Sequence, residues 1–117
     1  MRDPKERLRD IFQAMAAIER YRDRDRTAFE QDEMLQVWCL RHLQIIGEAA
    51  RALPEDIRNP APDIPWSKII GMRNIPVHGY FEIDTDIVWA AVQKDLPAPR
   101  PAVKALSNKL EEMGYGG

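Results

Sequence analysis

The segment from residue 72 to residue 81 brings together side chains that are suited to chemistry on phosphate groups. It reads MRNIPVHGYF, so Arg73 is followed after four residues by His78 and then by Tyr80. An arginine guanidinium is planar and permanently charged, and it can bind a phosphate and stabilise charge that develops there. A histidine imidazole titrates near neutral pH, so His78 can take a proton from a ribose 2′-hydroxyl or give one to a departing 5′-oxygen. This chemistry requires no metal.

The spacing by itself is a weak signal, because an arginine and a histidine this close occur by chance in many proteins. From the residue types alone, a structural interpretation is favoured. Arg73 would form a surface ion pair, His78 would satisfy a carbonyl group in a turn, and Tyr80 would be a half-buried packing residue. Pro76 and Gly79 limit helical continuation and could form a turn that brings Arg73 and His78 to the same side.

Length and composition predict one folded domain that spans residues 1–117. Hydrophobic residues make up 44% of the chain and charged residues 31%, which is typical of a globular protein. The formal net charge of -2 argues against nonspecific nucleic-acid binding through overall charge, so any RNA contact must be local. The apolar runs are too short to cross a membrane, and we expect a cytoplasmic protein.

Cysteine and histidine are too few for a disulfide framework or a zinc site. Cys39 is the single cysteine, and the chain has two histidines. We therefore expect no metal and no cofactor. We interpret Cys39 as a small buried hydrophobic residue, and His42, on an apolar stripe, as a hydrogen-bonded core histidine.

Helical periodicity runs through the first half of the chain. Asp3 can cap a helix that continues to about Tyr21. The alternating charges of residues 20–26 favour a solvated helix end over a phosphate-binding patch. Thr27 has the spacing of a helix cap, and the absence of proline or a turn cluster predicts one long helix to about Leu53. That helix is apolar on several faces, which indicates a central helix, a dimer interface or both.

Proline residues divide the second half of the chain. A connector of residues 54–65 contains four prolines. A third helix would begin at Pro65 and end near Asn74, a fourth would be capped by Asp84 and end at 96–99, and a fifth would begin near Pro101. Gly114 has the position of a C-terminal cap. No convincing strand is seen, so the fold class predicted is all-α.

The stretch of residues 66–84, WSKIIGMRNIPVHGYFEID, strongly resembles the HEPN superfamily, and within it the HepT-like toxin branch. The branch motif is Arg-x4-His-x-Tyr, which Arg73, His78 and Tyr80 match without a gap. The resemblance extends over nearly the whole chain, through IGEAA at 46–50, DIVW at 86–89 and KDLP at 94–97. Pro76 departs from the aliphatic residue expected at its position, so the local turn could differ slightly.

The resemblance implies a fold and a set of residue roles. The fold would be an up-and-down bundle of four or five helices that forms a homodimer or a higher homo-oligomer, with the motifs of two subunits facing each other across a cleft. Family members include metal-independent ribonucleases. His78 would be the acid and base, Arg73 would hold the scissile phosphate, and Asn74 would orient one of them.

The resemblance also implies a partner. HepT-like toxins pair with a minimal nucleotidyltransferase antitoxin, which adds AMP to the motif tyrosine, here Tyr80. The added bulk and negative charge beside His78 would block RNA. Two alternatives stay open. One is a non-catalytic module that binds a nucleotide or substrate for a nucleotidyltransferase, and the other is a structural helical dimer in which the motif only packs.

Overall fold

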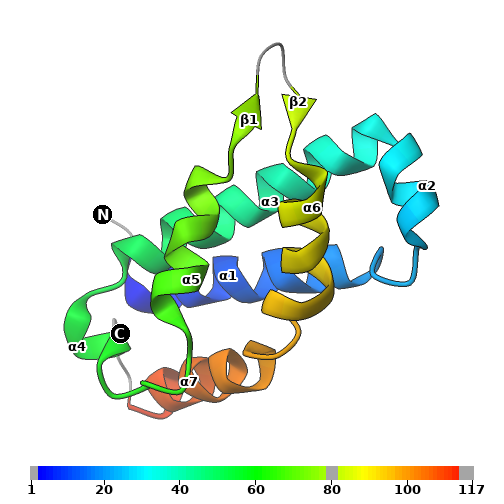
Figure 1. The fold of residues 1–117 in the computed structure, drawn as a ribbon. Coiled ribbons are helices and arrows are strands. Elements are labelled where there is room, and N and C mark those ends of the chain that lie inside the picture. Colours follow the sequence, from blue (N-terminus) through cyan, green and yellow to red (C-terminus); the bar gives the residue numbers. More distant parts are fainter. Residues whose placement is uncertain (1–2, 79–81, 114–117) are drawn as a thin grey trace.

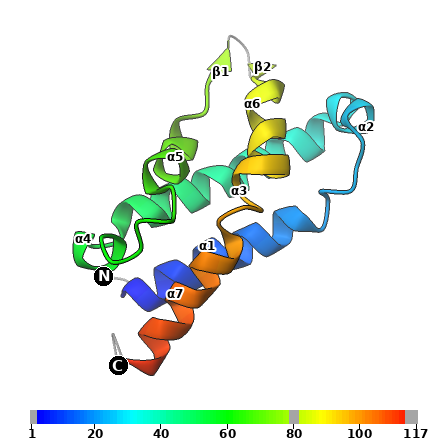
Figure 2. The same ribbon diagram turned by 60° about the horizontal axis from the view of Figure 1, so that its bottom comes forward.

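In a computed structural model, the chain is a bundle of helices built around two long antiparallel ones (Figure 1). The structure describes residues 3–78 and 82–113. Helix α1 spans Pro4–Glu19, and α3 spans Glu33–Ala52 beside it. Helix α7, Arg100–Glu112, packs on α1 from the other side (Figure 2). The all-α class predicted from the sequence is confirmed.

Three of the predicted helix starts are confirmed. The Asp3 carboxylate accepts a hydrogen bond from the backbone N–H of Glu6 at 3.0 Å, which caps α1. The Asp84 carboxylate accepts from Ile87 N–H at 3.2 Å and caps α6, Thr85–Ala90. This helix continues into a π-helical turn, η2 (Ala91–Asp95), and α7 has proline in its first turn. The predicted cap at Gly114 lies outside the described residues.

The prediction of one continuous helix from Thr27 to Leu53 is wrong. A short helix, α2, spans Arg26–Gln31, and α3 begins after a break at Asp32. The break is stable because side chains satisfy the free backbone groups on both sides of it. The Asp32 carboxylate accepts from Leu35 N–H at 3.0 Å, and the Gln36 amide donates to the carbonyls of Phe29 and Glu30 at 2.9 and 3.0 Å.

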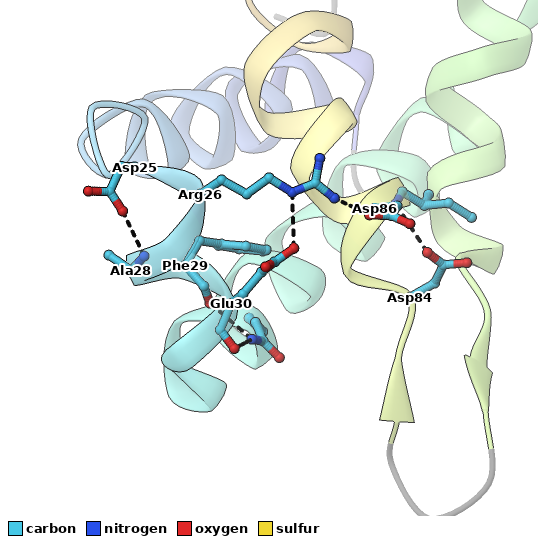
Figure 3. Close-up of polar contacts among 9 residues, drawn as sticks. Asp25, Arg26, Ala28, Phe29, Glu30, Asp84 and Asp86 are labelled. Carbon is cyan, nitrogen blue, oxygen red and sulfur yellow. Dashed lines mark hydrogen bonds and ion pairs between the residues drawn. The ribbon is translucent and has the colours of Figure 1, made fainter.

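The cap of α2 and its orientation also depend on side-chain contacts. Asp25, one residue before the helix and not Thr27, accepts from Ala28 N–H at 2.7 Å. The Arg26 guanidinium donates to Glu30 at 3.0 Å and reaches across to Asp86 on α6 (Figure 3). The hydrogen bond to Glu30 raises the pKa of Arg26. The contact between Arg26 and Asp86 joins the start of α2 to the first turn of α6.

A short helix and a two-stranded ladder were not predicted. Helix α4, Glu55–Arg58, lies within the proline-rich connector. The strands β1 (Val77–His78) and β2 (Glu82–Ile83) form an antiparallel ladder in which Val77 pairs with Ile83 and His78 with Glu82. A ladder of two residues per strand is too short to show an alternating hydrophobic pattern in the sequence. The ladder projects from one side of the bundle (Figure 1).

The core is one cluster of apolar side chains from most of the helices. Leu8, Ile11, Leu43, Ile46 and Val103 are among its fully buried members. Burial of this surface is the main favourable term that holds the bundle together. None of the helices in the described ranges is both apolar enough and long enough to span a bilayer.

Candidate functional site

Two buried side chains anchor the short helical segment on which the motif begins. Helix α5, Trp66–Gly71, passes into a 3₁₀ turn, η1, of Met72–Asn74. Met72 and Ile75 are buried, whereas Arg73 is half-buried and Asn74 is exposed between them. The two apolar anchors therefore turn Arg73 and Asn74 toward the outer surface. The predicted end of this helix near Asn74 is confirmed, with its last turn tightened.

A glycine on α3 allows η1 to approach closely. If Gly47 carried a Cβ atom, that atom would lie 2.5 Å from the backbone nitrogen of Arg73 and 3.0 Å from its Cβ. Real Cβ atoms essentially never show a contact under 3.0 Å. The absence of a side chain at Gly47 is therefore a condition for the observed position of Arg73. The contact joins residue 47 on α3 to residue 73 in the motif, 26 positions later in the chain.

The guanidinium of Arg73 also contacts α3. Its Nη1 donates to Oε1 of Glu48 at 3.4 Å, in an ion pair in which the Arg73 side chain is 29% exposed and that of Glu48 is 59% exposed. The Nε atom of Arg73 is covered from solvent and has no hydrogen-bond partner among the described residues. The ion pair at Arg73 that the structural interpretation of the sequence predicts is therefore present. It does not test whether Arg73 also acts on phosphate.

The other motif residues lie on or beyond the strand that follows η1. His78 is the last residue of β1, and its side chain is outside the described residues, as is the whole of Tyr80. The structure therefore brings Arg73 and Asn74 together on η1 and places the backbone of His78 on the adjoining strand. Their roles stay predictions.

The second histidine takes part in a different contact. The Nδ1 atom of His42 lies 2.8 Å from the carbonyl oxygen of Trp38, and the two rings are 4.0 Å apart. The predicted hydrogen bond is confirmed, but His42 is half-buried and not part of the core.

Cys39 lies in the core, as predicted. Its side chain is 2% exposed. Burial, with a smaller contribution from Asp32, raises the pKa of its thiol to about 11. In the described part of the chain, no three His, Cys, Asp or Glu side chains form a group that could hold a metal ion.

In the charge run at residues 20–26, Arg24 and Arg26 pair with carboxylates. Arg24 pairs with Asp32 at 3.5 Å, and Arg26 pairs with Glu30 and Asp86. Arg22 donates to the backbone carbonyl of Gln93 at 3.3 Å. These contacts favour the interpretation of a solvated helix end over that of a phosphate-binding patch.

Sequence reasoning gave no role to Gly47 or Glu48. One signal was available, because glycine in the interior of a helix costs about 1 kcal/mol relative to alanine and often marks a close backbone approach. The segment that approaches could not be identified from this signal. The partner of Glu48 was equally hidden, since Arg73 is far from it in the sequence.

Comparison with known proteins places the chain in a family. A family model described as "Ribonuclease HepT-like" matches residues 11–106, a range that includes α3, η1 and both strands. No solved structure gives a significant match.

Several curated proteins are similar over nearly their full length. The "Putative RNase MJ1380" of Methanocaldococcus jannaschii is 38% identical over 88% of this chain and 95% of its own. The "Probable ribonuclease HepT" of Thermococcus cleftensis is 36% identical over 83% of this chain and 89% of its own. The "Putative RNase TTE0752" of Caldanaerobacter subterraneus subsp. tengcongensis is 34% identical over 93% of this chain and 98% of its own.

Proposed function

Since this chain belongs to the HepT-like ribonuclease family of the HEPN superfamily, we propose that it is a metal-independent endoribonuclease and the toxin of a toxin–antitoxin pair. The observation that carries the proposal is the family match across residues 11–106, which contains the ungapped Arg73, His78 and Tyr80 motif. The half-exposed position of Arg73 on η1 supports it, because a phosphate in solvent can reach this side chain.

The proposed reaction is attack by the ribose 2′-oxygen on the adjacent phosphorus. His78 accepts the proton of the 2′-hydroxyl, the bond to the 5′-oxygen breaks, and a protonated histidine returns a proton to that oxygen. Arg73 binds the phosphate and stabilises the charge that builds on its oxygens. Asn74, exposed beside Arg73, orients Arg73 or His78.

Charge near the site is consistent with a local phosphate contact. Among the described residues, Glu48 is the one carboxylate that pairs with Arg73, and it engages Nη1 alone. An arginine carries five N–H donors, and although Nε of Arg73 is covered, N–H groups on the two Nη atoms remain for a phosphate. The net charge of -2 means that attraction of RNA depends on such positions and not on the whole surface.

The cleavage proposal is tested with purified protein and a labelled RNA. The wild type should cleave it in the presence of EDTA, and should not cleave RNA that has 2′-deoxyribose at the scissile position. His78→Ala should lose at least about 100-fold in rate, because general acid–base catalysis contributes this much. His42→Ala is the matched control, since it removes the other histidine and should retain the wild-type rate. Binding of RNA without cleavage by the wild type would support the non-catalytic binding module instead.

The toxin proposal includes silencing at Tyr80 by a nucleotidyltransferase. The Tyr80 oxygen would attack the α-phosphorus of ATP, lose its proton and release pyrophosphate, which leaves one AMP on the tyrosine. Co-expression with a minimal nucleotidyltransferase encoded beside this chain should add the mass of one AMP, and Tyr80→Phe should prevent it. An inactive complex with unmodified Tyr80 would indicate blockade by binding.

The homodimer with facing motifs is also part of the proposal. Arg73→Gln and His78→Ala subunits, unfolded together and refolded, would form heterodimers that have one intact arginine and one intact histidine in different chains. If each site takes its two residues from different subunits, about a quarter of the wild-type activity should return, because half of the dimers are mixed and half of their sites intact. No recovery, with a dimer confirmed by light scattering, would show that each subunit supplies both residues.

A further inference from the structure

Helix α3 holds Arg73 at both ends of its side chain. The backbone of Arg73 rests on Gly47, where a Cβ atom would come within 2.5 Å of its nitrogen. The guanidinium at the other end meets Glu48, the next residue on the same helix, at 3.4 Å. We propose that Glu48 is a positioning residue, which orients the Arg73 guanidinium toward the substrate phosphate. This inference rests on the proposed function of Arg73.

The Gly47 contact fixes the starting point of the arginine side chain. Gly47 is buried inside a 20-residue helix, and the anchors Met72 and Ile75 on either side of Arg73 and Asn74 are 5% and 8% exposed. The backbone of η1 therefore cannot move toward α3, because the contact is already close, and movement away would expose the anchors. The Arg73 Cα atom is held by packing and not by the loop alone.

The Glu48 contact restricts the far end of the side chain. A half-exposed arginine samples many rotamers, and ordering it costs free energy when it must bind a phosphate. An ion pair to one guanidinium nitrogen reduces this cost in advance, while the Nη donors that Glu48 does not engage stay available. The Glu48 side chain is 59% exposed, so it is open to solvent and can keep its contact with Arg73 when a phosphate binds.

A competing role for Glu48 has the opposite consequence. A carboxylate on Arg73 could keep a phosphate away, in which case its removal would accelerate cleavage. If Glu48 positions Arg73, its removal slows the chemical step. Loss of a negative charge near an anionic substrate does not weaken RNA binding in either case. The direction of the change in kcat therefore separates the two roles.

The experiment compares Glu48→Gln with Glu33→Gln, which removes the same charge at the other end of α3. Both side chains are exposed, and thermal unfolding confirms that each variant is folded. Glu48→Gln should lower kcat by about 10-fold with KM unchanged or lower, because misplacement of a catalytic group by about 1 Å can cost up to 100-fold. Glu33→Gln should match the wild type, and Glu48→Asp should recover part of the rate.

A second readout does not depend on activity. The Nε–H resonance of Arg73, assigned by its loss in Arg73→Lys, should show an ordered side chain in the wild type and in Glu33→Gln, and a mobile one in Glu48→Gln. Equal order in all three would overturn the positioning role, and a higher kcat in Glu48→Gln would establish the competing one. A wild type that cleaves no RNA would refute the proposed function, while the resonance would still show whether Glu48 holds Arg73.

Discussion

Helix α3 makes two contacts that work by different physical means. Its packing with α1 belongs to the apolar core, in which Ile46 is fully buried together with Leu8 and Ile11. Toward η1 it presents Gly47, against which the backbone of Arg73 lies directly. The first contact spreads its free energy over many side chains. The second depends on the absence of a single Cβ atom.

Substitutions at these two contacts should therefore act in different ways. A change in the α1–α3 contact should lower the free energy of unfolding and leave the geometry of the folded site intact. A change at Gly47 must move η1, because the neighbour that it would meet is backbone and cannot rotate away. Stability and activity should therefore separate along one helix.

The largest expected effect is on stability, at the α1–α3 contact. Ile46→Ala should lower the free energy of unfolding by about 2–5 kcal/mol, through lost burial and a residual cavity. Urea unfolding measures this loss, and the cleavage rate per folded molecule should stay at the wild-type value. Ile46→Val is the control and should cost about 0.5–1.5 kcal/mol. A fall in activity beyond the loss of folded protein would remove the distinction between the two contacts.

Substitution of Gly47 should have a smaller effect on stability and a larger effect on activity. Gly47→Ala should cost about 1–3 kcal/mol despite the better helix propensity of alanine, because the new Cβ meets the backbone of Arg73. Cleavage of RNA should fall about 10-fold or more, since Arg73 is displaced. Gly71→Ala is a close control: its Cβ would meet nothing within 4 Å, and its φ of -61° suits alanine. That variant should be as stable as the wild type or more so, and equal activity in both would argue against the packing role of Gly47.

A third prediction concerns the break between α2 and α3. Asp32→Ala should lower the free energy of unfolding by about 0.5–2 kcal/mol, because Leu35 N–H loses its acceptor. Asp32→Asn keeps a capping oxygen and should stay close to the wild type, which separates the cap from the exposed ion pair with Arg24. Thermal unfolding measures both variants. If Asp32→Ala were more stable than the wild type, the continuous helix first predicted would be the preferred state.

The smallest effect is expected at Cys39. Its pKa of about 11, raised by burial from the ordinary 9.0, leaves little thiolate at pH 8, so alkylation should be slow in the native protein and fast in urea. Because the folded pKa is the higher one, the thiol's contribution to stability is present below pH 9 and is lost as the pH rises toward 11. Cys39→Ser should abolish labelling. Rapid native labelling at pH 8 would show that this part of the core opens readily.

Much of the bundle could be predicted because its signals are local. The caps at Asp3 and Asp84 depend on residues three positions apart, and both are present in the structure. The end of the third helix near Asn74 follows from Pro76 two residues later. The break at Asp32 was missed because the carbonyls of α2 are satisfied by Gln36, a side chain of the next helix. An aspartate in a helical pattern does not by itself indicate a break.

The amino-acid sequence is enough to identify the residue types that could act on phosphate, most of the helices and the family of the chain. The contacts that support Arg73 follow only from the packing of the fold. Gly47 and Glu48 contact Arg73 although they lie far from it in the sequence, and hydrophobic periodicity does not reveal such contacts. The close approach of the two backbones depends on how α5 and η1 cross α3. The chemistry of a side chain follows from its residue type, whereas the direction in which a guanidinium points is set by packing between distant segments.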